Sequence, residues 1–211
     1  MTSGILHEPG GPYIVGGQKY PGVTTVLETL FRRAATCSED RDYYLERGSV
    51  VHKAVWLDVG GGDGSGLSDN NLDPIILPFI QGFRGFRKLH PFEVIQSELS
   101  VISRIFGYGG TLDLLVKWLK KGTDRLGLLD IKSGSKIPVG TKYQTSAYRK
   151  AFCETAKVDK KLITTHGLLL TPEGKAQLET YKYPDTNFQI FLHYLGCYHA
   201  EVNEGIRKPW G

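Results

Sequence analysis

The sequence predicts an α/β protein in which a central mixed β-sheet carries helices on both faces. Three observations support this: helical spacing of apolar residues in the first 90 residues, three strand patterns in succession after them, and then helix, strand, strand and helix. The chain has 211 residues, 40% of them hydrophobic, which is enough for a sizeable core. We therefore expect one domain over residues 1–211.

The first half of the chain is predicted to be mainly helical. Gly16 and Gly17 are typical of a tight hairpin turn. Ser38 is a preferred helix N-cap residue, and acidic residues follow it. Pro78 is expected to break or kink the helix that contains it. The predicted elements are a hairpin over 12–22 and helices over 23–35, 38–58 and 72–89.

The second half is predicted to form the sheet. Its apolar runs have strand length and are separated by glycine and polar residues, and its two helical patterns have apolar residues three and four apart. The predicted elements are strands over 92–105, 109–118, 126–132, 161–170 and 176–182, and helices over 139–157 and 185–204.

Composition excludes several classes of protein. Three cysteines, with no CxxC spacing, indicate neither a disulfide framework nor a zinc knuckle. No apolar run approaches the length of a membrane span, and the first residues do not look like a secretion signal, so we expect a cytoplasmic protein without a membrane partner. A net charge of +4 is compatible with a polyanionic partner but does not establish one.

A glycine-rich stretch, residues 59–71, lies between two predicted helices. It lacks the preceding strand and the glycine spacing of a phosphate-binding loop, and its acids miss the spacing of an EF-hand. Residues 59–90, which include Arg84, Arg87 and Lys88, could form a loop and helix that clamp a ligand over a site. A solvated helix face is an equally good interpretation of these basic residues.

Two aspartates interrupt the apolar strands of the stretch "GGTLDLLVKWLKKGTDRLGLLDIKSG", residues 109–134. A hairpin turn centred between Lys121 and Gly122 would place Asp113 directly opposite Asp130. Their Cβ atoms would then be about 4.5 to 5.5 Å apart, which is unfavourable for two like charges unless one is protonated or a cation lies between them. The pattern therefore favours a divalent metal site.

Lys132 shares a strand face with Asp130, because side chains two apart point the same way. Glu98 would join this face, diagonal to Asp113, if the preceding turn were centred at position 106.5 or 107.5, but would point away if the turn were centred on Gly107. Carboxylate oxygens suit Mg²⁺ or Mn²⁺, and a lysine beside them suits the anionic transition state of phosphodiester hydrolysis. The plainer interpretation is a pair of solvated strand residues.

Two helical features complete the candidate site. Gln144 and Tyr148 are four residues apart and therefore lie on one helix face. His52 lies one turn after Gly48 in "RGSVVH". By itself, a lone helical histidine is more often a structural or surface residue than a ligand.

The strings "RGSVVH", "GTLD", "DIK" and Q-x-x-x-Y occur in this order, and together they resemble the PD-(D/E)xK nuclease superfamily. The resemblance is to the RecB-like branch, which includes Cas4-type proteins, phage exonucleases and the mitochondrial genome maintenance exonuclease. The stretch "YPGVTTVLETL" is also similar to the "PSVTTIL" segment that begins many phage and mitochondrial members. The resemblance extends over residues 20–150 and implies a restriction-endonuclease-like core.

The resemblance implies a role for each matching residue. His52, Asp113, Asp130 and the Ile131 carbonyl would bind the metal, and Lys132 would be the catalytic lysine. Glu98 lies near the position of an acid found in some members. Gln144 and Tyr148 would hold the scissile strand. The iron-sulfur cysteines of many Cas4 and AddB members are missing, so no such cluster is expected.

The resulting expectation is a Mg²⁺- or Mn²⁺-dependent DNA exonuclease that acts on single strands or DNA ends, in bacterial or phage replication, recombination or repair. A single-strand annealing or replication protein could be its partner. The alternatives are a structure-specific endonuclease of the same fold and a non-catalytic DNA-binding module. The basic residues expected to contact phosphate are Arg32, Arg33, Lys136, Lys142, Arg149 and Lys150.

Overall fold

The computed structural model describes residues 4–7, 10–28, 30, 38–61, 67–119 and 125–209. Its centre is a five-stranded sheet in the order β4-β5-β6-β7-β8. Strands β6 and β7 are parallel and the other neighbours are antiparallel, so the predicted mixed sheet is confirmed. The strands are β4 (Phe92–Ser103), β5 (Tyr108–Trp118), β6 (Leu126–Ser133), β7 (Ile163–Leu170) and β8 (Ala176–Thr180).

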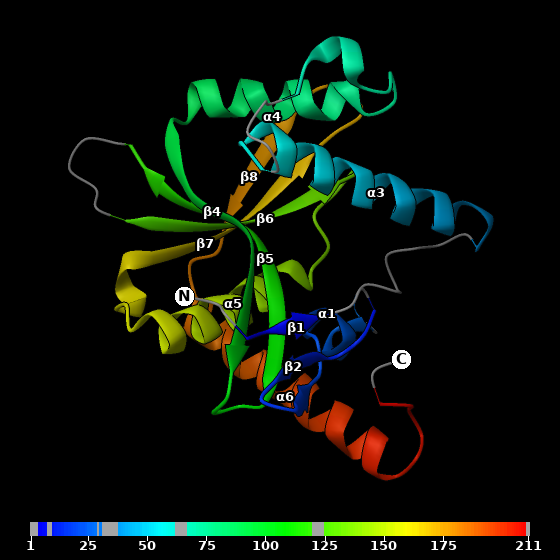
Figure 1. Cartoon of the computed structure of the whole chain (residues 1–211), viewed down its shortest axis with the longest axis vertical. Helices are drawn as coiled ribbons and strands as arrows, with labels where there is room; N and C mark the ends of the chain where they lie inside the picture. The colour runs from blue at the N-terminus through cyan, green and yellow to red at the C-terminus, as the bar shows by residue number, and fades with distance from the viewer. Residues whose placement is uncertain are drawn as a thin grey trace.

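Helices cover both faces of this sheet, as predicted (Figure 1). One face packs against α3 (Ser38–Asp58) and α4 (Leu77–Leu89). The other packs against α5 (Thr141–Ala156) and α6 (Pro184–Asn203), with α1 (Val23–Val26) at its end. Short 3-10 turns, η1 (Asp69–Asn71) and η2 (Lys160–Leu162), precede α4 and β7.

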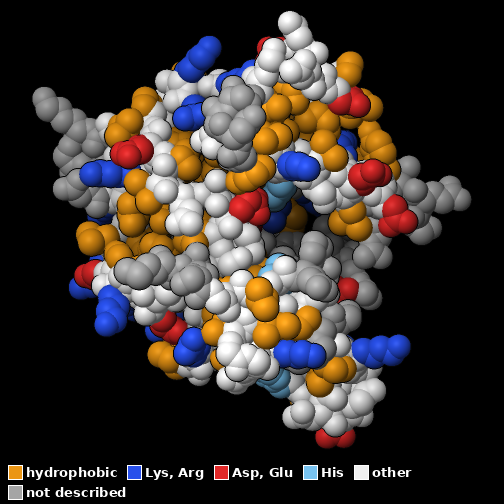
Figure 2. Space-filling view, in the orientation of Figure 1, with side chains coloured by type: hydrophobic (Ala, Val, Ile, Leu, Met, Phe, Trp, Pro, Cys, Tyr) orange, Lys and Arg blue, Asp and Glu red, His pale blue; other side chains and the backbone are white. Residues whose placement is uncertain are grey.

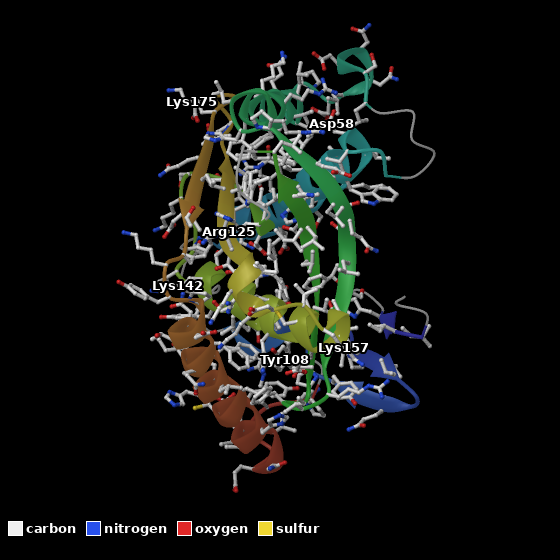
Figure 3. All side chains as sticks on the ribbon, turned by 90° about the vertical axis from the view of Figure 1, so that its left-hand side faces the viewer. Asp58, Tyr108, Arg125, Lys142, Lys157 and Lys175 are labelled. Carbon is white, nitrogen blue, oxygen red and sulfur yellow. The ribbon has the colours of Figure 1, made fainter. Side chains whose placement is uncertain are left out.

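Two separate cores result from this layering. The α5-side core contains Leu99, Leu112, Leu115, Ala147 and Phe191. The α4-side core contains Val51, Phe79, Leu114, Leu129 and Ile131. Strand β5 contributes side chains to both cores, so it connects them. Figure 3 shows Tyr108, at the beginning of β5, and Asp58, at the end of α3, toward opposite ends of the long axis.

A small N-terminal sheet packs on the beginning of β5. It consists of β1 (Leu6–His7), β2 (Tyr13–Val15) and β3 (Gln18–Tyr20). The predicted hairpin forms β2 and β3, and Gly16 and Gly17 both have positive φ, as a two-residue hairpin turn requires. The edge strand β1 was not predicted.

Two predictions about elements need correction. The helix expected over 72–89 begins only at Leu77, and Pro78 occupies its first turn, where proline has no unsatisfied N–H and does not kink the helix. The turn after β4 is centred between Ile105 and Phe106, because Ser103 pairs with Tyr108. Of the helix predicted over 23–35, α1 is its described beginning, and residues 29 and 31–37 lie outside the described residues.

Candidate functional site

The predicted register of the β5–β6 hairpin is confirmed. Leu114 pairs with Leu129 and Lys117 pairs with Leu126, which is the register that a turn between residues 121 and 122 produces. The ladder ends at the Leu114–Leu129 pair. Asp113 and Asp130 are therefore the next opposed positions, where the two strands separate.

Asp113 occupies this separation with its own side chain. Its Oδ2 accepts a hydrogen bond of 2.6 Å from the Ile131 backbone N–H, which has lost its ladder partner on β5. The alternation of side chains also breaks here, because Leu112 and Leu115 both lie in the α5-side core although they are three residues apart. The aspartate is thus a structural part of the strand as well as a candidate ligand.

Glu98 lies on β4 at the position that faces Asp113 across the ladder. Leu99 pairs with Leu112 and Ser97 with Leu114, so Glu98 is directly opposite Asp113 and not diagonal to it. Its φ is +49°, a conformation that a residue with a β-carbon rarely adopts. Strained backbone of this kind concentrates at functional sites, and here it coincides with the acidic residue that faces the aspartate.

His52 completes a group of three ligand-type side chains. It comes from the middle of α3, and its Nδ1 lies 3.3 Å from Asp113 Oδ1. One ligand atom each from His52, Glu98 and Asp113 lies within 4.8 Å of the others. Asp130 is not a member of this group. The structure therefore brings together three of the four side chains predicted as ligands, and the fourth lies beside them.

Asp130 is instead paired with the predicted catalytic lysine. Lys132 Nζ lies 2.7 Å from Asp130 Oδ2 and donates a hydrogen bond of 3.2 Å to Gln144 Oε1. Gln144 in turn donates from Nε2 to the Tyr148 hydroxyl at 2.9 Å. This chain of contacts fixes the amide orientation of Gln144 so that its oxygen faces the ammonium group.

The carboxyl groups of the site have strongly shifted pKa values. Desolvation, together with the negative charge of Asp113, raises the pKa of Glu98 to about 7, although part of this residue is exposed. Burial raises the pKa of Asp130 to about 6, against the opposing effect of Lys132. Crowded acids with raised pKa values are typical of sites that bind a cation or move protons.

Asp113 and His52 each favour the charged form of the other. Burial would raise the pKa of Asp113, but the charge and hydrogen bond of His52, together with Lys132 and the Ile131 N–H, lower it. Burial would likewise lower the pKa of His52, and Asp113 reverses that effect, so the pKa of His52 is raised. When protonated, the imidazole would compensate the charge of the aspartate.

Two adjacent glycines fit the strand to its neighbours. A β-carbon at Gly110 would lie 2.2 Å from the Tyr148 ring, and one at Gly109 would lie 2.6 Å from the Tyr13 ring. The string "GGTLD" therefore places Tyr148 against β5 on one side and the N-terminal sheet on the other. Their packing against rings was not predicted from the sequence.

The predicted substrate-binding residues differ in their exposure. Gln144 and Tyr148 are 4% and 2% exposed, and Gln144 is hydrogen-bonded to both Lys132 and Tyr148, so their contact with a bound strand stays a prediction. Arg149 is buried as well. It pairs with Asp185 at 2.9 Å and donates to the carbonyls of Lys160 and Ile163, because its face of α5 packs against η2 and β7. Lys136 is exposed in the loop between β6 and α5, and its contact with phosphate stays a prediction.

Other basic residues have protein partners of their own. Arg84, in the predicted clamp, pairs with Asp58 and with Asp69. Arg87 lies over the Phe83 and Phe92 rings. Lys142 lies over Tyr143, and Lys150 lies over Phe106 and near Glu154. Arg32 and Arg33 lie outside the described residues.

An open cleft of about 710 Å³ leads to His52, Glu98 and Lys132. Figure 2 shows a hollow near the middle of this face, with histidine and basic side chains at its wall. The part of 59–90 that the structure describes contributes no residue to the lining, so the clamp stays a prediction. The residues that line the cleft are Thr24, Tyr44, Leu45, Gly48, Ser49, His52, Lys53, Trp56, Glu98, Lys132 and Ser133.

Sequence reasoning missed two aromatic residues of this lining. Tyr44 and Trp56 lie on the same face of α3 as His52, at a spacing of four residues that includes Gly48. The signal was present in the sequence as Y-x-x-x-G-x-x-x-H-x-x-x-W.

Comparisons with known proteins give structural similarity only. No protein family and no curated protein matches the sequence. A proposed exonuclease from Eubacterium rectale superposes with a TM-score of 0.46 and 15% identity, over 92% of this chain and 79% of that one. The structure of SSO0001 superposes with a TM-score of 0.37 and 12% identity, over 88% of this chain and 87% of that one.

Within the part of the chain that the structure describes, no helix combines the length and the apolar character that crossing a bilayer requires.

Proposed function

We propose that this chain is a Mg²⁺- or Mn²⁺-dependent deoxyribonuclease that hydrolyses phosphodiester bonds as an exonuclease, on single strands or DNA ends. The observation that carries the proposal is the convergence of His52, Glu98 and Asp113 within 4.8 Å, beside an ion-paired Lys132, in an open cleft. The resemblance of the sequence motifs to PD-(D/E)xK nucleases gives independent support.

The residues present fit a divalent cation. Two carboxylates and an imidazole offer atoms close enough to share one ion. Desolvation and the charge of Asp113 raise the pKa of Glu98, and a cation would favour the charged form of this carboxyl group. When bound, the ion would lower the pKa of a water and neutralise charge on the phosphate oxygens. Asp130 and the Ile131 carbonyl would extend the ligand set if Asp130 exchanges Lys132 for the ion.

The residues of the chain perform the remaining steps. Lys132 holds a positive charge beside the ligand group, where charge builds on a phosphate during hydrolysis. Gln144 and Tyr148 keep its ammonium in place, because the amide oxygen has one fixed orientation.

An assay with end-labelled DNA tests the proposal. Single and double strands are incubated with Mg²⁺, Mn²⁺ or EDTA, and with the Lys132→Met variant. We expect metal-dependent release of short products, none in EDTA, and a loss of about 100-fold or more in the variant. Equal hydrolysis by wild type and Lys132→Met would refute the assignment.

Closed circular single-stranded DNA separates the alternative functions. An exonuclease leaves the circle intact and degrades the same strand after linearisation. An endonuclease opens the circle, and a non-catalytic module binds both forms and cuts neither.

A further inference from the structure

The cleft carries a feature that phosphate chemistry does not require, namely two aromatic side chains on either side of the ligand group. Tyr44 is two helical turns before His52 and Trp56 is one turn after it, or about 12 Å and about 6 Å along the axis of α3. Both rings line the cleft. A ligand that passes His52 along this helix would therefore meet an aromatic ring on each side.

Each ring is held on one side by the protein. The Arg47 guanidinium lies 4.9 Å from the centre of the Tyr44 ring and 5.2 Å from the centre of the buried Phe79 ring, so Arg47 connects Tyr44 to the α4-side core. The backbone of Gly61 packs against Trp56, because a β-carbon there would lie 2.4 Å from the indole. Supported rings of this kind are ordered before a ligand binds, which reduces the entropy lost on binding.

The rings also keep surface for a ligand. Tyr44 is 51% exposed, and Trp56 is half-buried. The same helix supplies Lys53, which is exposed, and Lys132 reaches the cleft from the sheet. Aromatic rings interleaved with basic side chains along a groove are the arrangement by which proteins bind single-stranded nucleic acid.

We propose that Tyr44 and Trp56 stack on unpaired bases, on either side of the phosphate that reaches the His52, Glu98 and Asp113 group. This inference rests on the proposed function for the position of the phosphate, and it names the substrate class as single-stranded nucleic acid. A paired base is already stacked and cannot offer its face to either ring. The selection of single strands thus comes from α3 and not from the metal ligands.

Binding without hydrolysis tests the inference separately from catalysis. Fluorescence anisotropy in EDTA compares a labelled oligothymidylate of about 12 nucleotides with an abasic strand of equal length and with a duplex. An oligouridylate of the same length tests whether RNA binds as DNA does. We expect the oligothymidylate and the oligouridylate to bind more tightly than the abasic strand, which has the same phosphates but no base to stack. We also expect them to bind more tightly than the duplex, whose bases are already stacked.

Variants assign the preference to the two rings. Tyr44→Ala and Trp56→Ala should each weaken oligothymidylate binding about 5- to 100-fold and leave abasic and duplex binding unchanged. Tyr44→Phe and Trp56→Phe should restore most of the affinity. Tyr183→Ala is the matched control, because Tyr183 is 70% exposed and does not line the cleft.

The outcomes distinguish the two proposals. Equal affinity of Tyr44→Ala and wild type for oligothymidylate, or no preference of wild type for bases over abasic strand, overturns the stacking inference even if hydrolysis is observed. Base-dependent binding without any hydrolysis supports the inference and refutes the nuclease. Because Tyr44 is half exposed, its truncation should not unfold the protein, and thermal melting checks this.

Discussion

Two histidines, His52 on α3 and His166 on β7, lie in opposite environments. The His52 site (His52, Glu98, Asp113, Asp130 and Lys132) surrounds its imidazole with charged groups, and Asp113 raises the pKa of His52. The His166 site (His166, Thr164, Thr180 and Trp118) is neutral. There His166 is hydrogen-bonded to the hydroxyls of Thr180 at 2.9 Å and Thr164 at 2.7 Å, and burial lowers its pKa to about 4.

The difference shows what burial does with and without a compensating charge. Desolvation is the largest single effect on both imidazoles and disfavours the charged form of each. Only the His52 site supplies carboxylates to reverse it. Trp118 instead contacts His166 edge-on, at 5.3 Å between ring centres. One histidine is therefore prepared for ionic chemistry and the other is a neutral packing residue.

Asp113→Asn should reduce the difference between the two histidine sites most strongly. The amide oxygen can still accept from the Ile131 N–H, so the sheet should persist, but the charge that holds the His52 pKa up is removed. We expect the pKa of His52 to fall below its ordinary value and hydrolysis to decrease at least about 100-fold. NMR titration of the imidazole and a nuclease assay measure both effects.

The matched control for this variant is Asp69→Asn, which removes a carboxylate that pairs with Arg84 away from the cleft. It should leave the His52 titration and hydrolysis unchanged. A His52 pKa that stays raised in Asp113→Asn would refute the account of the site.

The His166 site should make the fold sensitive to acid. Its folded pKa of about 4 lies below the ordinary 6.5, so the unfolded chain binds the extra proton first. The stability contributed by neutral His166 is fully present above pH 6.5 and is lost as pH falls to 4, by about 3 kcal/mol. The free energy of unfolding in urea, measured at several pH values for wild type and for His166→Gln, isolates the contribution of His166. Parallel pH profiles of the two proteins would contradict it.

Metal binding should give the His52 site a pH dependence of its own. Protons compete for Glu98 below about pH 7 and for Asp130 below about pH 6, so affinity for Mn²⁺ should fall as pH decreases, about tenfold per unit for each competing proton. Calorimetry in two buffers of different ionisation enthalpy should detect proton release near neutral pH. His166→Gln should leave this profile unchanged, and a flat profile in wild type would exclude these ligands.

Tyr148→Phe should produce the smallest effect. It removes the acceptor for Gln144 Nε2, and one neutral hydrogen bond contributes about 1 kcal/mol, so kcat should decrease up to about tenfold. KM should not change, because Tyr148 is 2% exposed and lies outside the cleft lining. Tyr183→Phe is the control. A change confined to KM would instead favour a direct contact between Tyr148 and the strand.

Local patterns in the sequence predicted the sheet and the meeting of two carboxylates. The polar, glycine-bearing stretch between two apolar runs predicted the β5–β6 register, and a register fixes which side chains face each other. Residues 120–124, where the turn was expected, lie outside the described residues. The residue opposite Glu98 could not be predicted uniquely. It depends on the turn between β4 and β5, and "RIFGYGG" allows this turn at several positions. The structure centres this turn at position 105.5, one or two positions earlier than expected, so the partner of Glu98 is Asp113 and not a residue two or four positions later.

Long-range partners explain the failures. Nothing near Arg149 in the sequence indicates that Asp185, 36 residues later, pairs with it. Arg84 likewise meets Asp58, which is 26 residues earlier. A basic residue beside a motif suggests phosphate binding, but its partner is decided by which helix face packs inward. His166 was not identified either, although a histidine between strand-forming residues in "ITTHGLLL" is a signal of a buried imidazole.

The hydrogen bond from Ile131 to Asp113 has a consequence for how such chains diverge. A descendant that lost its chemistry would still be selected to keep this aspartate, or an asparagine, because the sheet needs an acceptor where the strands part. Glu98 has no comparable protection, since its strained backbone would relax if glycine replaced it. Among proteins of this architecture, an acid at the position of Glu98 should therefore indicate retained activity more reliably than an aspartate at the position of Asp113.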